Sequence, residues 1–285
     1  MSATEWLKAL GPAPLMWPQR VRVHFKLWIV TLCRPARSAP PRTGMLAMSV
    51  GVGAALAVIA ATMVLVDGWA IAHVHRLPAW LIAAFLRISD FGRSGWLLWP
   101  IGLVLLALAA LVRPALGRMT NLVAAAIVVR LGFIFLAIGI PGLVVAIVKR
   151  LIGRVRPSDL GPFHYVLFAW RPDYASFPSG HSTAAFAAAV AVGAVWERTR
   201  PAMWIYAVLI AASRVCVAAH YPSDVLAGAF VGITSALVIR RWFAVRQLGF
   251  SVDARAGVRP LPGPSRRRVG RLIATLLTID NRARP

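Results

Sequence analysis

Long apolar stretches separated by short polar or basic segments dominate this sequence of 285 residues. A helix needs about 20 mainly apolar residues to cross about 30 Å of hydrocarbon. The apolar stretches predict six transmembrane helices, at residues 45–66, 97–112, 122–148, 181–196, 202–219 and 222–239. The pattern therefore predicts an all-α, polytopic membrane protein.

Composition agrees with this prediction, because 59% of the residues are hydrophobic, only 14% are charged and the mean hydropathy is +0.71. The formal net charge of +23 would favour nucleic-acid binding in a soluble protein. Here the basic residues flank apolar stretches, as the positive-inside rule and anionic lipid headgroups require. We therefore expect membrane lipids near the basic segments and no nucleic-acid partner.

The distribution of Lys and Arg also predicts the orientation. With both termini on the cytoplasmic side, the cytoplasmic segments carry 22 of these residues and the opposite side carries 8. The first long apolar stretch, from about Met45, is long enough to remain as a membrane span rather than be cleaved as a signal peptide. We therefore expect a multi-pass protein of the inner (plasma) membrane, with the loops after the first, third and fifth helices on the extracytoplasmic face.

The chain divides by composition into three parts. Residues 1–44 form a basic cytoplasmic or interfacial segment, residues 45–245 the six-helix domain, and residues 246–285 a basic cytoplasmic tail. Within the tail, the Pro-, Arg- and Gly-rich residues 251–268 predict a linker. The stretch SRRRVGRLIATLLT that overlaps its end fits either a surface helix or a solvated tail.

Two further features are local. The stretch LPAWLIAAFLRISDFGRSGW, between the first two predicted spans, is typical of an amphipathic helix in the outer interface. Cys33 lies in the basic N-terminal segment and Cys216 in an apolar stretch, so the two predict neither a disulfide framework nor a metal site.

Polar residues at the outer ends of the predicted spans form three clusters, each of which needs a reason because polar groups in a membrane are costly. The first is KRLIGRVRP, in which Lys149 and Arg156 bracket the exit of the third span and Pro157 prevents further helix. Basic residues often end spans by snorkelling to the interface. Against that interpretation, a concentration of cations is disfavoured on the outer face.

The second cluster is FPSGHS, at the start of the fourth span. Ser179 and Gly180 immediately precede this helix, so its free backbone N–H groups and its dipole are expected to converge on an anion. His181 stands in the first turn, where the positive end of the dipole disfavours the imidazolium form. The alternative is a capped helix with an interfacial histidine.

The third cluster is SRVCVAAHYPSD, where Arg214 lies within the fifth span, His220 at its end and Asp224 four residues later. An intramembrane Arg indicates a functional site by default. A carboxylate beside a histidine fixes its tautomer and stabilises the imidazolium, as a nucleophilic histidine requires. A structural ion pair would explain Asp224 but would leave Arg214 without a role.

Together the clusters supply three cations, a helix N-terminus, two histidines and one carboxylate, which is the inventory of a phosphate site. Three cations surround the non-bridging oxygens of a phosphoryl group and stabilise its transition state without a metal. One histidine attacks phosphorus, while the other protonates the leaving oxygen and later activates water. No metal or other cofactor is expected, because no carboxylate cluster or His-rich metal spacing occurs in the sequence.

The same residues resemble the type 2 phosphatidic acid phosphatase superfamily, whose signature is K-x6-RP, PSGH and SR-x5-H-x3-D. All three parts match residue for residue between Lys149 and Asp224. The resemblance implies a phosphohistidine mechanism in which His220 attacks, Asp224 supports it and His181 donates the proton to the leaving group. The residues that hold the phosphoryl oxygens are then Lys149, Arg156, Ser179, Gly180 and Arg214.

The expected activity is therefore that of a membrane lipid phosphate or pyrophosphate phosphatase. Undecaprenyl pyrophosphate, phosphatidic acid, phosphatidylglycerol phosphate and lipid A all present a phosphate to such a site, and family resemblance ranks undecaprenyl pyrophosphate and simple glycerolipid phosphates first. Two alternatives stay open: a lipid-linked phosphotransferase, and a transporter or anion-binding membrane protein that uses the cations for recognition only. The sequence indicates no oligomeric state.

Overall fold

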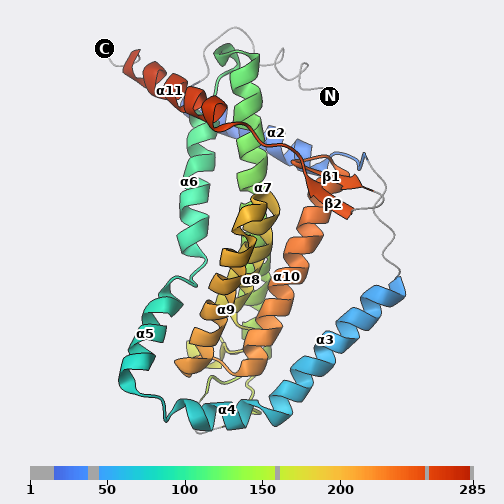
Figure 1. The fold of residues 1–285 in the computed structure, drawn as a ribbon, viewed down its shortest axis with the longest axis vertical. Coiled ribbons are helices and arrows are strands. Elements are labelled where there is room, and N and C mark those ends of the chain that lie inside the picture. The colour runs from blue at the N-terminus through green and yellow to red at the C-terminus, as the bar shows by residue number, and fades with distance from the viewer. Residues whose placement is uncertain (1–15, 38–44, 158–160, 254–256, 283–285) are drawn as a thin grey trace. The chain divides into compact units, whose positions relative to one another are not determined.

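The computed structural model describes residues 16–37, 45–157, 161–253 and 257–282, and these residues are mostly helical (Figure 1). The helices are α2 (Trp17–Cys33), α3 (Met45–Leu65), α4 (Asp67–Val74), α5 (Ala79–Asp90), α6 (Gly95–Leu111), α7 (Arg118–Ile152), α8 (Gly180–Val195), α9 (Arg200–Cys216), α10 (Pro222–Val245) and α11 (Arg266–Arg282). The all-α prediction is confirmed for the membrane part of the chain.

Four helical stretches in the described ranges have the length and apolar composition needed to cross a membrane: Met48–Leu65, Ala79–Leu111, Arg118–Ile152 and Pro222–Val245. The second contains both the expected interfacial helix and the expected second span, which α5 and α6 form with a short turn between them. The helices α8 and α9 have 16 and 17 residues, fewer than the about 20 residues that are typical of a membrane-spanning helix. The number of six spans therefore stays a prediction.

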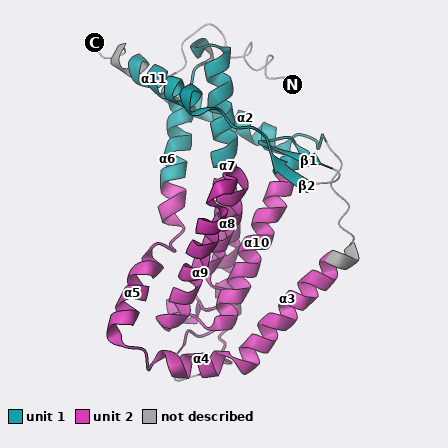
Figure 2. Cartoon of the chain, in the orientation of Figure 1, with its two compact units in different colours: residues 1–39, 100–132, 243–285 teal, residues 40–99, 133–242 magenta. Residues whose placement is uncertain are grey.

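The chain forms two compact units (Figure 2). Unit 1 contains residues 1–39, 100–132 and 243–285, and unit 2 contains residues 40–99 and 133–242. The boundaries at residues 44 and 245 that composition suggests stay predictions.

In unit 1, the C-terminal helix α11 packs Leu272 against Val123 and Ala124. The Arg130 guanidinium donates hydrogen bonds to the backbone carbonyls of Leu261 and Pro262, at 2.8 and 3.0 Å. These contacts show that the stretch SRRRVGRLIATLLT is a helix with a packed face, which favours the surface-helix interpretation over a solvated tail.

The prediction of a linker at residues 251–268 is wrong, because two short strands lie in this part of the chain. The strands β1 (Phe250–Asp253) and β2 (Gly257–Pro260) pair antiparallel, with Val252 opposite Val258. Gly249 and Gly257 have φ angles of 68° and 72°, a conformation that side chains disfavour. Gly249 lies directly before β1 and Gly257 is the first residue of β2, so these two glycines lie at the ends of paired strands.

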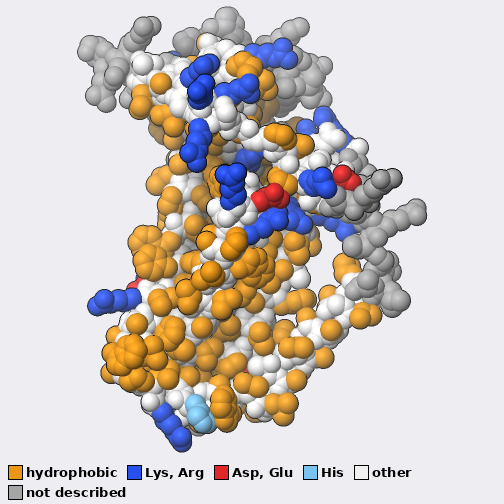
Figure 3. Space-filling model, viewed as in Figure 1, with side chains coloured by type: hydrophobic (Ala, Val, Ile, Leu, Met, Phe, Trp, Pro, Cys, Tyr) orange, Lys and Arg blue, Asp and Glu red, His pale blue; other side chains and the backbone are white. Residues whose placement is uncertain are grey.

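In unit 2, α9 packs against α8 and α5, and small residues make the central helix contacts possible. The side chains of Ala185, Ala189 and Ala207 are buried together with Ile210. Alanine at such positions lets helix backbones approach closely in a membrane. On the visible face of α3, α9 and α10, hydrophobic side chains cover most of the surface, as helices in contact with lipid require (Figure 3).

Candidate active site

The N-terminus of α8 forms one wall of the candidate site. The helix begins at Gly180, and Ser179 is its N-cap, whose hydroxyl oxygen accepts a 3.5 Å contact from the Ser182 backbone N–H. Ser179 and Ser182 are fully buried, whereas His181 in the first turn is partly exposed. The free N–H groups of such a helix start are suited to bind phosphate oxygens.

A residue of the third motif contacts this helix start directly. The Ser179 backbone N–H donates a 3.0 Å hydrogen bond to the carbonyl oxygen of Asp224, at the beginning of α10. Gly228 and Gly232 let α10 approach α8, because a Cβ atom at either position would lie 2.4 Å from a carbonyl oxygen of α8 or its N-cap. Ser179 and Asp224, which belong to different motifs and lie 45 residues apart in sequence, are thus joined by a backbone hydrogen bond.

His220 and Asp224 lie side by side in this region. The His220 Nδ1 atom is 3.6 Å from Asp224 Oδ2, longer than a hydrogen bond, and the Ser176 hydroxyl lies next to both. Ser176 Oγ donates to Asp224 Oδ2 at 2.5 Å, and the Tyr221 backbone N–H donates to the same oxygen at 2.9 Å. Since Nδ1 faces the carboxylate, Nε2 is the ring nitrogen that is available to a substrate.

The environment of His220 favours the neutral form of the ring. Its side chain is almost completely buried, and this burial lowers the pKa of His220, although Asp224 acts in the opposite direction. Arg214 and Arg156 lower it further through their positive charge. A neutral imidazole is the form that attacks phosphorus.

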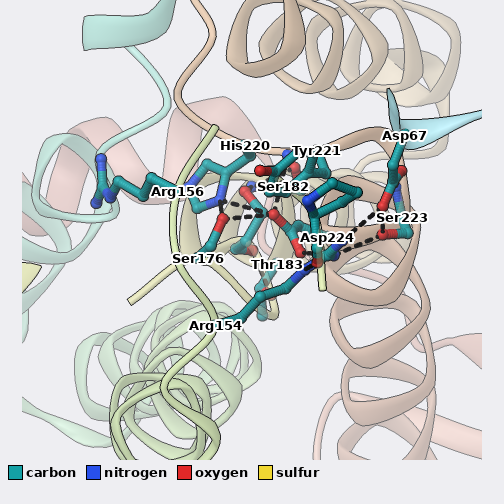
Figure 4. A network of polar contacts seen from close by, with 12 residues as sticks. Asp67, Arg154, Arg156, Ser176, Ser182, Thr183, His220, Tyr221, Ser223 and Asp224 are labelled. Carbon is teal, nitrogen blue, oxygen red and sulfur yellow. Dashed lines mark hydrogen bonds and ion pairs between the residues drawn. The ribbon is translucent and has the colours of Figure 1, made fainter. Parts of the chain in front are cut away.

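A buried arginine that the sequence motifs do not assign lies behind Asp224 (Figure 4). The Arg154 guanidinium is fully buried and donates to Asp224 Oδ1 at 2.6 Å, to Asp67 Oδ2 at 2.7 Å and to Ser223 Oγ at 2.7 Å. Burial lowers the pKa of Arg154, but the two carboxylates outweigh burial and raise its pKa overall. Arg154 is therefore charged and paired.

The three predicted cations gather around the histidines. Arg214 is buried in the last turn of α9 and donates to the Ser89 hydroxyl of α5. Its Nε atom is buried and has no hydrogen-bond partner among the described residues. Arg156 interacts electrostatically with Arg214, His220 and Lys149, and donates from Nε to the Pro172 carbonyl at 3.1 Å. Such clustered positive charge is unfavourable unless an anion binds.

His181 belongs to the same cluster. Arg214, His220, Lys149 and Arg93 all act on it electrostatically. The turn after α5 lies against its ring, because a Cβ atom at Gly92 would be 2.9 Å from His181 Cδ2. The structure thus brings together the eight residues that the sequence predicted, around one site at the ends of α7, α8, α9 and α10.

Sequence reasoning missed several residues that complete this arrangement: Asp67, Ser89, Arg93, Arg154, Ser176 and Ser223. One signal was present, since Asp67 is an acid directly after an apolar stretch in a chain with only 9 Asp and Glu residues. The serines carried no signal, because their role depends on partners that are distant in sequence.

Among the residues that the structure describes, no three His, Cys, Asp or Glu side chains gather as they would to hold a metal ion. The donors around His181 and His220 are mainly Arg and Lys, which repel a divalent cation. The metal-independent mechanism stays a prediction, which the experiment below addresses.

The fold and the site define a polytopic helical membrane protein with a cluster of cations around two histidines. Residues 130–248, which include all three motifs, match the family model of the PAP2 superfamily. This finding confirms the resemblance that the motifs indicate.

Two similar proteins carry the names of phosphatases. A lipid A 1-phosphatase of Rhizobium johnstonii is 38% identical over 115 residues, which cover 39% of this chain and 47% of that protein. An undecaprenyl-diphosphatase of Sulfolobus acidocaldarius is 35% identical over 99 residues, covering 31% of this chain and 46% of that protein. The matches thus span about half of the length of these relatives.

Among solved structures, the first transmembrane PAP2-type phosphatidylglycerolphosphate phosphatase from Bacillus subtilis has 23% sequence identity to this chain and a TM-score of 0.48. The similarity covers 68% of this chain and 93% of that one.

Proposed function

We propose that the protein is a metal-independent phosphatase of membrane lipid phosphates or pyrophosphates that works through a phosphohistidine intermediate. The observation that carries the proposal is the placement of a buried His220, with Nδ1 toward Asp224, among Arg156, Arg214 and the N-terminus of α8. A phosphoryl group held by these donors has a nucleophile beside it. The phosphatase names of the relatives support the same class of reaction.

In the proposed first step, His220 Nε2 attacks phosphorus while the bond to the lipid oxygen, or to the leaving phosphate of a pyrophosphate, breaks. His181 gives its proton to that leaving group. Asp224 stabilises the positive charge that develops on the His220 ring. In the second step His181 takes a proton from water, which attacks the phosphohistidine and releases inorganic phosphate.

The remaining residues act on the charge of the transition state. Arg214, Arg156 and Lys149 hold the non-bridging oxygens together with the Ser179 hydroxyl and the Gly180 backbone N–H at the start of α8. The buried Arg214 Nε has a free donor in the described structure, which suits this role. Preorganised cations of this kind are worth most where water is excluded.

A lipid phosphate suits a site among apolar helices, because the tail stays in the bilayer while the phosphate reaches the helix ends. The candidate substrates are undecaprenyl pyrophosphate, phosphatidic acid, phosphatidylglycerol phosphate and lipid A. The named relatives act on lipid A and on undecaprenyl diphosphate, which supports including both in an assay panel.

The decisive experiment is phosphate release from this panel by the detergent-purified protein in the presence of EDTA, with His220→Ala as the comparison. We expect activity on at least one lipid for the wild type and none for the variant. Trapping of ³²P on the protein from a labelled substrate should require His220. If EDTA abolishes turnover, or if His220→Ala retains it, the mechanism is wrong and a metal enzyme or an anion-binding protein takes its place.

We further propose that the protein lies in the inner membrane with both termini cytoplasmic and the site on the extracytoplasmic face. The excess of Lys and Arg in the terminal segments supports this orientation. In a Cys216→Ser background, the exposed Cys33 should react with a membrane-impermeant maleimide only after the cells are permeabilised. In a Cys33→Ser, Cys216→Ser background, Phe163→Cys, at an exposed position, should react in intact cells. The reverse pattern would invert the orientation.

A further inference from the structure

We propose that Asp67 and Arg154 are positioning residues that hold Asp224 in place to support His220. The inference rests on the proposed function and adds two residues that the motifs do not assign to the reaction. The contacts that carry it are drawn in Figure 4, where Asp67, Ser223, Arg154, Asp224 and His220 form one continuous polar network.

The first argument is geometric, because every polar atom of the Asp224 carboxylate is engaged. Oδ1 accepts from Arg154 at 2.6 Å, while Oδ2 accepts from Ser176 and from the Tyr221 backbone at 2.5 and 2.9 Å. These contacts approach from different directions and leave the carboxylate little rotational freedom. Oδ2 is therefore fixed beside His220 Nδ1 before a substrate binds.

Arg154 is itself held on several sides. Its Nε atom donates to the Pro162 carbonyl at 3.0 Å, and the guanidinium lies 4.4 Å from the centre of the Tyr221 ring. Asp67 accepts a hydrogen bond from Arg154 Nη2. It also accepts from the Ser223 backbone N–H at 2.9 Å and from the Ser223 hydroxyl at 2.5 Å. The N-terminus of α4 thus connects to the start of α10 through one guanidinium.

The second argument is electrostatic. An arginine paired with Asp224 alone would neutralise the carboxylate that must stabilise a positively charged His220 ring. Asp67 supplies a second buried negative charge, so the three groups together keep one net negative charge behind His220. Burying three charges is costly, and such groups contribute little net stability compared with apolar residues. A catalytic purpose accounts for that cost.

The test is Asp67→Asn, which keeps the size of the side chain and removes its charge, with Asp173→Asn as a matched control at an exposed carboxylate. Intact sites are counted by calorimetric titration with inorganic phosphate, so that loss of folded protein does not count as loss of rate. Per intact site, we expect Asp67→Asn to lower kcat about tenfold and to change KM less than twofold. Asp173→Asn should leave both constants unchanged.

Arg154→Lys provides the second variant, since it keeps the charge but cannot bridge both carboxylates. Its kcat per intact site should fall, and its KM should stay unchanged. If either variant lowers only the number of intact sites, with a normal kcat for those that remain, Asp67 and Arg154 are purely structural and the inference is overturned. If the wild type releases no phosphate from any lipid, the proposed function itself fails.

A second inference comes from a different part of unit 2. We infer that the groove between α5 and α9 binds the hydrocarbon chain of the lipid substrate. The groove has a volume of about 320 Å³ and is lined by apolar side chains, among them Ile88, Phe91, Ile205, Leu209 and Ile210. The inference rests on the proposed function, because it assigns a place to the lipid part of the same substrate.

Continuity with the phosphate site favours this occupant. A Cβ atom at Gly92 would lie 2.6 Å from Ile210 Cγ2 in the groove and 2.9 Å from His181 Cδ2 in the site. Under the proposed mechanism His181 protonates the leaving oxygen, so the lipid must depart on the side of His181. The groove reaches that side through Ile210 and Gly92. The cations Arg93 and Arg214, which act electrostatically on His181, match the anionic headgroup.

The groove is tested with Ile205→Trp, which fills it, and with Val208→Trp as the matched control. Both positions are exposed apolar residues of α9, but only Ile205 lines the groove. The substrates are the lipid phosphate that the wild type hydrolyses fastest and its short-chain, water-soluble analogue. We expect Ile205→Trp to lower kcat/KM about tenfold for the long-chain form and less than twofold for the short one, with Val208→Trp changing neither.

Three outcomes would overturn the groove assignment. These are no effect of Ile205→Trp on either substrate, an equal loss for both substrates, and the same loss in Val208→Trp. In each case the wild type still hydrolyses the lipid, so the failure is separate from that of the proposed function.

Discussion

Gly228 of α10 lies so close to Ser179, the N-cap of α8, that a Cβ atom at residue 228 would be 2.4 Å from the Ser179 carbonyl oxygen and 3.1 Å from Ser182 Cβ. The carbonyl oxygen belongs to the backbone, so a side chain at residue 228 can be accommodated only by moving one helix. The end of α8 that we propose binds phosphate thus depends on a glycine of the neighbouring helix α10.

The first prediction follows from this contact. Gly228→Ala should destabilise the protein by about 1–3 kcal/mol and lower kcat/KM, because the helix start moves away from the cations. Gly142→Ala is the control, since nothing lies within 4 Å of the Cβ position there. Thermal unfolding in detergent and phosphate release measure both effects. Equal behaviour of the two variants would show that the helix contact has no such role.

The second prediction concerns pH. Burial lowers the pKa of His220, and Asp224 partly opposes this effect, while Arg214 and Arg156 add to it. In Asp224→Asn the opposing carboxylate is gone, so the pKa of His220 should fall further and the neutral nucleophile should persist to lower pH. The acid limb of kcat/KM should therefore move to lower pH, while the plateau rate falls about a hundredfold or more.

The control for this experiment is the substrate, whose own phosphate ionisation is the same for both proteins. A shift of the acid limb thus reports a group of the protein. A limb that stays in place, or that moves to higher pH, would mean that His220 does not govern it.

The third prediction concerns the hydrogen bond from Arg214 to Ser89. Ser89→Ala removes the acceptor that orients the guanidinium, and a hydrogen bond to a charged group is worth about 1.5–3 kcal/mol. We expect KM to rise about tenfold. Thr62→Ala, which removes a hydroxyl bonded to the Val58 carbonyl of α3, should leave KM unchanged. An unchanged KM in Ser89→Ala would remove Ser89 from the phosphate site.

The fourth prediction concerns Arg93, which acts electrostatically on His181 and Arg214 from an exposed position. Exposed charges contribute weakly and are screened by salt. Arg93→Gln should therefore raise KM about two- to threefold at low ionic strength and have no effect at about 1 M salt. Arg87→Gln, at an exposed arginine of the preceding helix α5, is the control. A salt-independent effect would contradict a purely electrostatic role.

The helices were predictable because their signal is local. The observed starts of four helices lie within a few residues of the predicted ones: α3, α7, α8 and α10. The prediction succeeded because a membrane-spanning helix requires a long apolar stretch, which is visible in the sequence. The merger of the second span with the preceding helix into one candidate stretch, and the hairpin at Phe250, were not predictable. They depend on how segments pair and not on their composition.

The sequence by itself determined which groups the proposed chemistry uses. The motif is specified by the spacing of Lys149, Arg156, His181, Arg214, His220 and Asp224, and helix starts and turns place each cluster. Only the tertiary structure decided that Arg154 joins Asp224 to Asp67, which is 87 residues from Arg154 in the chain. The physical reason is that a motif records neighbours along the backbone, whereas a buried charge finds its partner only when distant helices pack together.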